Sequence, residues 1–174
     1  NLKELERLGG NFEYYKKPHW ITNNIVSSGE IPMSNEVEPV SEICYLKNDE
    51  GFYDDPVLDD QALYITTNQG LIIILGCAHR GIINTINHAR QVTEMEEVYM
   101  VIGGTHLANA PQERLDFTLE QLQKLNVKKL GVSHCTGMRS AAFFVNKLSS
   151  EKFFYNNAGT EISFDGAKTQ ITSF

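Results

Sequence analysis

The chain has 174 residues, of which 41% are hydrophobic and 21% are charged, and its formal net charge is −7. This composition is typical of one globular domain with enough apolar residues for a core, and it argues against disorder. No run of Lys and Arg is longer than two residues. We therefore expect neither nucleic acid nor a membrane surface as a partner.

The sequence also predicts a cytoplasmic location. It contains no apolar stretch near the ~20 residues that cross a bilayer, and no charged-then-apolar leader at its start. Its three cysteines, Cys44, Cys77 and Cys135, are widely spaced and odd in number. They do not form a disulfide framework, so we expect reduced thiols in a reducing compartment.

The first third of the chain predicts little regular structure. Leucines in residues 2–8 indicate a short helix that ends at Gly9-Gly10, and we treat residues 1–19 as a peripheral segment. Residues 20–44 suggest short strands and loops. Residues 47–60 are acidic and rich in turn formers, so we expect an exposed connection.

From Gln61 onward the pattern alternates strands and helices. Two β-rich runs joined at residues 68–70 indicate a hairpin, and the second run is apolar throughout, so both its faces should be covered. The other predicted elements are a helix over 81–94, a strand over 97–104, a helix over 115–125, a strand over 128–134, a helix over 139–148 and a hairpin over 152–164. This order indicates an α/β domain with a largely parallel sheet and right-handed crossovers.

Histidines follow three successive predicted strands, at the points where the strands end. They are His79 in "LGCAH", His106 in "IGGTH" and His134 in "GVSH". Because the carboxyl ends of parallel strands face one crevice, the three side chains should converge there. Imidazole is a common metal ligand, and the preceding glycines permit tight turns and close backbone approach. The pattern therefore predicts a metal site.

The alternative for any single histidine is a hydrogen bond that caps a strand or helix, but three at equivalent strand ends favour function. We assign no role to His88, which we expect to be solvated in mid-helix, or to His19 in an irregular segment. Among the acidic residues, Asp60 is the best site candidate. A solvated face is the alternative for Asp59 and Asp60, and Glu30 is weaker. Asp54 and Asp55 are expected to be solvated.

Two cysteines and one threonine adjoin these histidines. Cys77 and Cys135 could be thiolate ligands, or a nucleophile activated by a neighbouring histidine. We favour simple packing for both, because each lies at the tip of a buried strand. Thr136 adds a hydroxyl at a strand-to-helix turn, where backbone N–H groups could hold an anionic group of a substrate.

Several strings together resemble a known family: "GLIIILGCAHRGIINTI", "VIGGTHL", "VSHCTG" and the terminal "AGTEISF". They are similar to the second half of a metallo-β-lactamase-fold hydrolase. Within that superfamily they resemble the 7,8-dihydropterin-6-methyl-4-(β-D-ribofuranosyl)aminobenzene-5'-phosphate synthase-like subgroup, over residues 20–174. The resemblance implies half of an αββα sandwich, with a mixed sheet and helices on one face.

The sequence departs from this family in one large respect. It contains no HxHxDH motif, which in the family supplies several metal ligands, and it does not begin with Met. We therefore expect residues 1–174 to be a single domain that forms the C-terminal portion of a longer protein. Its missing N-terminal half would be a partner that covers an otherwise large apolar face of the sheet.

The resemblance also implies a function for the intact protein. It would be a metal-dependent hydrolase or related transferase that uses metal-activated water. His79 and His134 hold positions of metal ligands, and His106 is a catalytic proton-handling group or a further ligand. Whether Cys77 or His79 stands where relatives place a bridging aspartate is open. One or two divalent ions are expected, zinc first, with iron or manganese as alternatives.

Two other functions remain open at this point. One is an enzyme with a Cys/His nucleophile, formed by Cys77 or Cys135, and the other is a non-catalytic binding module. Whether this chain alone has activity is also open, as is its oligomeric state. The substrate would be a small molecule, phosphorylated or pterin-like, and a phosphate ester, a thioester, a lactone and a pterin derivative are all compatible.

Overall fold

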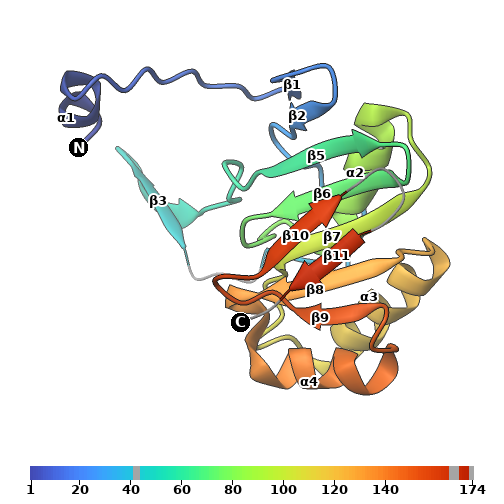
Figure 1. Ribbon diagram of the computed structural model, residues 1–174. Helices are drawn as coiled ribbons and strands as arrows, with labels where there is room; N and C mark the ends of the chain where they lie inside the picture. Colours follow the sequence, from blue (N-terminus) through green and yellow to red (C-terminus); the bar gives the residue numbers. More distant parts are fainter. Residues whose placement is uncertain (41–43, 165–168, 173–174) are drawn as a thin grey trace.

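The computed structural model describes residues 1–40, 44–164 and 169–172. Figure 1 shows one central sheet with helices packed on one face and a two-stranded hairpin across the other. This arrangement confirms the predicted α/β class with a mixed sheet.

The central sheet has seven strands in the order β1-β2-β5-β6-β7-β8-β9. Their bounds are β1 (His19–Trp20), β2 (Ile25–Ser27), β5 (Ala62–Thr67), β6 (Gly70–Leu75), β7 (Val98–Gly104), β8 (Lys129–Ser133) and β9 (Phe153–Tyr155). The pairs from β1 to β6 are antiparallel, whereas β6, β7, β8 and β9 are parallel. The predicted hairpin around residues 68–70 is confirmed, but only this second half of the sheet is parallel.

Three helices connect the parallel strands. They are α2 (Ile82–Thr93), α3 (Gln112–Lys124) and α4 (Gly137–Lys147), and a short 3₁₀ helix, η1 (His134–Thr136), precedes α4. A further helix, α1 (Leu2–Arg7), lies at the N-terminus. The crossovers α2, α3 and α4 all match helices predicted from apolar periodicity. Each follows a parallel strand, so each begins near the carboxyl edge of the sheet.

The main core lies between the sheet and these three helices. Ile73, Val101 and Leu130 from neighbouring strands point to the same face and pack with Ile86 of α2 and Phe144 of α4. Alternate residues of a strand point to opposite faces, so every second residue joins this layer. Burying each such side chain stabilises the fold by about 1.5–3 kcal/mol.

The opposite face of the sheet is less fully covered. Ile72 and Met100 are buried there, but Ile74 is only half-buried. A hairpin of β10 (Glu161–Phe164) and β11 (Thr169–Thr172) crosses this face, as Figure 1 shows. The Tyr99 ring meets Phe164 edge-on, and its hydroxyl lies 2.6 Å from Thr169 Oγ1. The expected coverage of both faces of β6 is therefore confirmed except at Ile74.

The predicted hairpin over residues 152–164 is wrong. Its first run is β9, which joins the central sheet parallel to β8, and its second run is β10, which pairs with β11. The crossover helix α4 returns the chain to the amino end of the sheet, so β9 can only run parallel. Residues 165–168, between β10 and β11, lie outside the described part of the chain.

The expected exposed connection over 47–60 contains a hairpin of its own. It consists of β3 (Tyr45–Asn48) and β4 (Gly51–Asp54), and Figure 1 shows it standing away from the central sheet. Asn48 Oδ1 accepts hydrogen bonds from Glu50 N and Gly51 N and so closes the turn. The exposure is as expected. The regular pairing was not predicted, because acidic turn-rich sequence masks a short strand.

His88 is another correction, because it is buried and not solvated. Its Nδ1 lies 3.0 Å from the Tyr64 hydroxyl on β5, and both side chains are enclosed between α2 and the sheet. Burial lowers the pKa of His88, which favours the neutral ring. Helix α2 therefore buries a polar side chain as well as its isoleucine stripe.

The N-terminal segment begins with a short exposed helix. Helix α1 has no buried residue, and Figure 1 shows it at the end of a long extended segment. Among the described residues, every helix is too short or too polar to cross a membrane. The cytoplasmic location stays a prediction.

Candidate functional site

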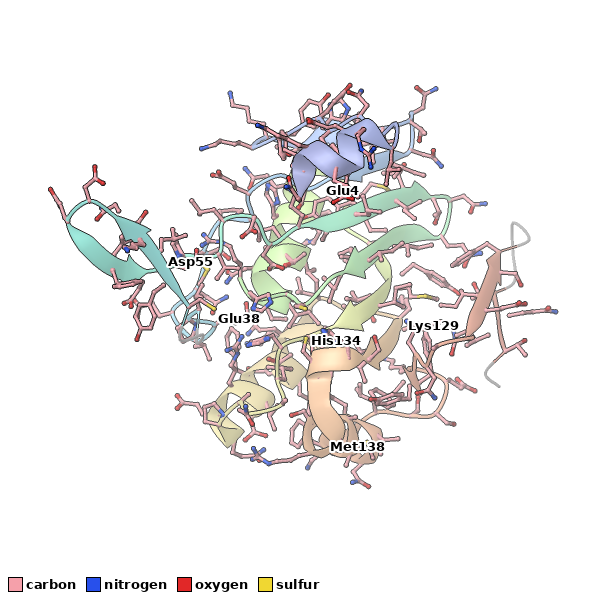
Figure 2. All side chains as sticks on the ribbon, turned by 90° about the vertical axis from the view of Figure 1, so that its left-hand side faces the viewer. Glu4, Glu38, Asp55, Lys129, His134 and Met138 are labelled. Carbon is pink, nitrogen blue, oxygen red and sulfur yellow. The ribbon has the colours of Figure 1, made fainter. Side chains whose placement is uncertain are left out.

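The three histidine turns lie at one edge of the sheet. Strands β6, β7 and β8 are parallel, so their carboxyl ends face the same side. His79 lies in the turn after β6, His106 follows β7, and His134 begins η1 directly after β8. Figure 2 looks onto this edge and shows His134 there, with Met138 further along on α4.

Each of the three turns contains a non-glycine residue with left-handed backbone. The φ angles are 55° at Ala78, 50° at His106 and 50° at His134. This conformation is uncommon for residues other than Gly, although His, Asn and Asp adopt it more often than most. The other described non-glycine residues with positive φ lie outside these turns, and they are Val57, Glu94 and Asn126. The conformation is therefore a shared feature of the three turns and does not by itself identify a site.

Close backbone packing joins the turns after β6 and β7. Gly104 N donates to Gly76 O at 3.0 Å. A Cβ on Gly104 would lie 2.7 Å from both Gly76 O and Cys135 Sγ, closer than real Cβ contacts. The predicted role of a glycine in permitting close approach is confirmed at this position.

Cys77, His134 and Cys135 form the one cluster of potential metal ligands found among the described residues. One ligand atom from each of the three lies within 4.8 Å of the others. The Cys135 thiol donates to Cys77 O at 3.3 Å, and Cys135 Sγ accepts from His106 N at 3.3 Å. Burial raises the pKa of Cys135 to about 11, so the protonated thiol is the dominant form at neutral pH before any ion binds.

His79 and His106 form a second pair beside this cluster. Their ring centroids are 4.5 Å apart with planes inclined by 33°, and both side chains are half-buried. The two predicted ligands, His79 and His134, are thus in different groups: His134 lies with the two cysteines and His79 lies with His106. Their assignment as metal ligands stays a prediction.

Thr136 and Asp60 make hydrogen bonds that fix the turns. The buried Thr136 hydroxyl lies 2.9 Å from Thr105 Oγ1 and accepts from Thr105 N at 3.2 Å. Asp60 Oδ2 accepts from Arg80 N at 3.0 Å, next to His79 in the chain. Burial raises the pKa of Asp60, and the nearby charge of His79 acts in the opposite direction. Both residues therefore hold the turns in place through hydrogen bonds.

The weaker candidates lie elsewhere. Glu30 and Asp59 line a hollow of about 680 Å³ beside the N-terminal segment, together with His19. The His19 ring stacks on Tyr15, with centroids 3.8 Å apart, and Glu30 Oε1 lies 3.7 Å from Lys16 Nζ. The hollow is large, but its lining includes none of the residues of the histidine turns.

Glu38, a fully buried carboxylate next to the turn after β6, was not identified from the sequence. Glu38 Oε1 accepts from Ile83 N at 3.0 Å, and Oε2 accepts from Asn84 N at 2.9 Å. It thus caps the N-terminus of α2 from outside the helix. A Cβ on Gly81 would lie 2.4 Å from Glu38 Oε2. Gly81 is therefore the residue whose presence in the sequence could have indicated a group packed against the start of α2.

Arg80 was also missed, although it follows His79 directly. Its side chain is buried, and Nε and Nη1 donate to Ile31 O at 2.5 Å and Pro56 O at 2.7 Å. Together with Asp60 this makes a network that ties two loops to the turn after β6. We call it the Arg80 network.

A second hollow, of about 510 Å³, opens beside the metal-ligand cluster. His106, Cys135 and Arg114 of α3 are among the residues that line it. We call it the Arg114 pocket.

Comparison with known proteins identifies the class of fold. A crystal structure of a metal-dependent hydrolase of the beta-lactamase superfamily matches with a TM-score of 0.78 and 24% sequence identity, over 91% of this chain and 60% of that one. The described chain therefore has a metallo-β-lactamase-type fold. No protein-family profile matches the sequence.

The sequence is also similar to a particular enzyme. It is 36% identical, over 94% of this chain, to the 7,8-dihydropterin-6-methyl-4-(beta-D-ribofuranosyl)-aminobenzene-5'-phosphate synthase of Methanocaldococcus jannaschii, and the match covers 56% of that protein. An uncharacterized protein of the same organism is 28% identical over 91% of this chain and 57% of its own length. These matches confirm the resemblance predicted from the motifs. The chain spans a little over half the length of these relatives.

Proposed function

We propose that this chain is the C-terminal part of a metal-dependent enzyme with a metallo-β-lactamase-type fold, which acts on a phosphorylated or pterin-like small molecule. The observation that carries the proposal is the convergence of Cys77, His134 and Cys135 at the carboxyl edge, where their ligand atoms lie within 4.8 Å of one another. This edge is also where open α/β sheets bind their ligands.

The chemistry of the donor set fits a divalent ion. Two sulfurs and one imidazole nitrogen are common zinc ligands, and ligand atoms around tetrahedral zinc lie roughly 3.5–4 Å apart. Thiolate ligands favour zinc over manganese, so we keep zinc first, with iron as the next candidate. Both thiols would have to release their protons when an ion binds. One or two ions fit the proposal, because further ligands would come from the N-terminal half.

The histidines divide the remaining roles. His134 would hold the ion together with the cysteines, and His79 would be a further ligand beside them. His106 lines the Arg114 pocket, where it could pass a proton to a leaving group or hydrogen-bond a developing oxyanion. When bound, the ion would supply an activated water and polarise a carbonyl or phosphoryl oxygen.

The reaction is proposed only at the level that the relatives share. One relative is named a synthase and the solved neighbour is described as a hydrolase. Both hydrolysis and group transfer can use the same metal-assisted attack on an electrophilic centre. The pterin-like character of the substrate rests on the synthase, and the fold itself leaves the substrate open.

A thiol nucleophile is the less well supported alternative. A reactive cysteine needs a lowered pKa, whereas burial raises the pKa of Cys135. Its sulfur is also engaged with Cys77 O and His106 N. These contacts suit a thiol that is packed in place or a metal ligand better than they suit a nucleophile.

The test is metal content by elemental analysis, on this chain and on the full-length protein, for His134→Ala against wild type. We expect the variant to lose most of its metal and, in the full-length protein, its activity as well. His19→Ala is the matched control, because His19 stacks on Tyr15 away from the edge. Unchanged metal content in His134→Ala would show that the ligand assignment is wrong.

Two further variants separate the two groups of predicted ligands. If the cysteines ligate, Cys77→Ser and Cys135→Ser should lower metal content as strongly as His134→Ala. If His79 ligates instead, His79→Ala should do so while the cysteine variants retain metal. A full-length protein that binds no divalent ion would favour the non-catalytic binding module.

A further inference from the structure

Arg114 is a buried cation whose main hydrogen-bonding edge is unused. It lies in the first turn of α3, and its side chain is 4% exposed. Nη1 lies 3.5 Å from Pro39 O, which is a weak contact. Among the described residues, neither Nε nor Nη2 has a hydrogen-bond partner, and both atoms are enclosed by protein.

The two unused nitrogens are chemically informative. Nε and Nη2 form one edge of the planar guanidinium, and this edge binds two oxygens of a carboxylate or phosphate group at once. A buried charge without a partner is costly, so such groups are normally paired. The open edge therefore points to an anionic ligand.

Glu38 does not satisfy this edge. Its negative charge acts on Arg114, but its two oxygens accept from Ile83 N, Asn84 N and Asn35 Nδ2. The carboxylate is thus committed to the N-terminus of α2. Burial lowers the pKa of Arg114 while Glu38 raises it, and an arginine remains charged at neutral pH.

The Arg114 pocket supplies a second source of positive potential. Ala110 and Pro111, which directly precede α3, line the same hollow as Arg114. Helix α3 has 13 residues and no side-chain cap at its N-terminus, and the only acidic side chain in its first turn is the exposed Glu113. Unpaired N–H groups and the helix dipole make such an end favourable for anions. The net charge of the chain is −7, so the buried Arg114 and the N-terminus of α3 make this hollow a locally favourable place for an anion.

We infer that the Arg114 pocket is an oxyanion subsite, in which the Arg114 guanidinium binds the phosphate or carboxylate group of a small molecule through Nε and Nη2, which are enclosed by protein and must turn toward the hollow to do so. His106 and Cys135 line the same pocket, so the rest of the ligand would extend toward the histidine turns. That the ligand is a substrate rests on the proposed function, whereas the binding of an anion does not. Arg114 is then a specificity residue that anchors one end of the molecule.

The test is a calorimetric titration of the metal-free chain with inorganic phosphate and, separately, with acetate, both at constant ionic strength. We expect saturable binding to wild type, weakened about tenfold or more in Arg114→Gln, because a charged two-point contact is lost. Arg7→Gln is the charge-matched control. Arg7 is exposed on α1, so this variant should bind like wild type. The anion that binds more tightly identifies the ligand group.

Thermal unfolding shows whether Arg114→Gln is folded. If it is not, Arg114→Lys decides, because it retains the charge but loses the two-point edge and should still bind severalfold more weakly. Wild-type affinity in a folded Arg114 variant, or no saturable binding of either anion to wild type, would overturn the inference. Metal content is measured separately on the same proteins. A chain that binds phosphate through Arg114 but no metal would contradict only the proposed function.

Discussion

Arg80 and Arg114 are both buried arginines near the same edge of the sheet, but their surroundings differ. The Arg80 side chain donates to Ile31 O and Pro56 O at 2.5 and 2.7 Å. Arg114 has only a weak contact with Pro39 O, and its Nε and Nη2 have no partner in the described part of the chain. Arg80 links two loops through hydrogen bonds within the protein, whereas Arg114 has unused hydrogen-bond donors and lines a pocket.

The difference teaches how to separate structural from functional polar groups at one site. A buried group whose donors are all used within the protein contributes to stability, and its loss leaves acceptors unsatisfied. A buried group with unused donors costs stability, so its presence calls for a ligand or another function. The same substitution should therefore lower stability much more at Arg80 than at Arg114.

The largest expected effect is on stability at Arg80. Arg80→Gln should lower the free energy of unfolding by about 3 kcal/mol, because two hydrogen bonds from a charged donor are lost and the carbonyl of the buried Ile31 loses this partner. Arg114→Gln should stay within about 1 kcal/mol of wild type, because removing an unpaired buried charge offsets the lost packing. Urea denaturation of the two variants measures both values. Equal decreases in the free energy of unfolding would show that Arg80 and Arg114 do not differ in their contribution to stability.

The next effect concerns the close packing of Gly104 against Gly76 and Cys135. Gly104→Ala should cost about 1–3 kcal/mol, because its Cβ would overlap Cys135 Sγ and Gly76 O. Metal content should fall with it, since the thiol would be displaced. Gly76→Ala is the matched control, because the nearest atom to its Cβ would be Gln61 O at 3.7 Å. If both variants retain metal equally, close packing at Gly104 does not position the cluster.

The smallest effect is a pH dependence in the Arg80 network. Burial raises the pKa of Asp60, so between its ordinary value near 4 and its raised value the folded protein binds more protons than the unfolded chain. Asp60 therefore contributes stability at low pH that is lost as pH rises through this window. Asp60→Asn can still accept from Arg80 N but does not titrate.

Urea midpoints of wild type and Asp60→Asn, compared from about pH 3 to pH 7, isolate this contribution. The stability of wild type relative to the variant should fall as the pH rises. The opposite slope would mean that the charges of His79 and Arg80 outweigh burial, and that the ionised carboxylate is the form that the network holds.

The sequence predicted the crossover helices and the edge turns well, because both depend on local patterns. Isoleucines at helical spacing defined α2, and histidines directly after apolar runs located the three turns. Glu38 and Arg114 could not be found in this way. Glu38 accepts hydrogen bonds from Ile83 and Asn84, about 45 positions later in the chain. The lack of hydrogen-bond partners at Arg114 Nε and Nη2 among the described residues is a property of the folded surroundings, which local sequence does not reveal.

The errors have the same origin. His88 lies among polar neighbours in the sequence, but its partner is the Tyr64 hydroxyl on β5, which only the fold brings near. The strand β9 was assigned to a hairpin because the turn after it is easily recognised, whereas its parallel pairing with β8 depends on the path of α4. Local periodicity identifies an element, and long-range contacts decide its neighbours.

Because Glu38 caps α2, hydrogen exchange at two backbone amides of that helix can report on the position of the Glu38 loop. The amides of Ile83 and Asn84 are bonded to a residue of the loop that also contributes Val37 and Pro39 to the Arg114 pocket. When this loop lifts, these amides lose their acceptor before the rest of α2 must open. Their hydrogen exchange would therefore report how often the pocket wall opens, even in the absence of any ligand.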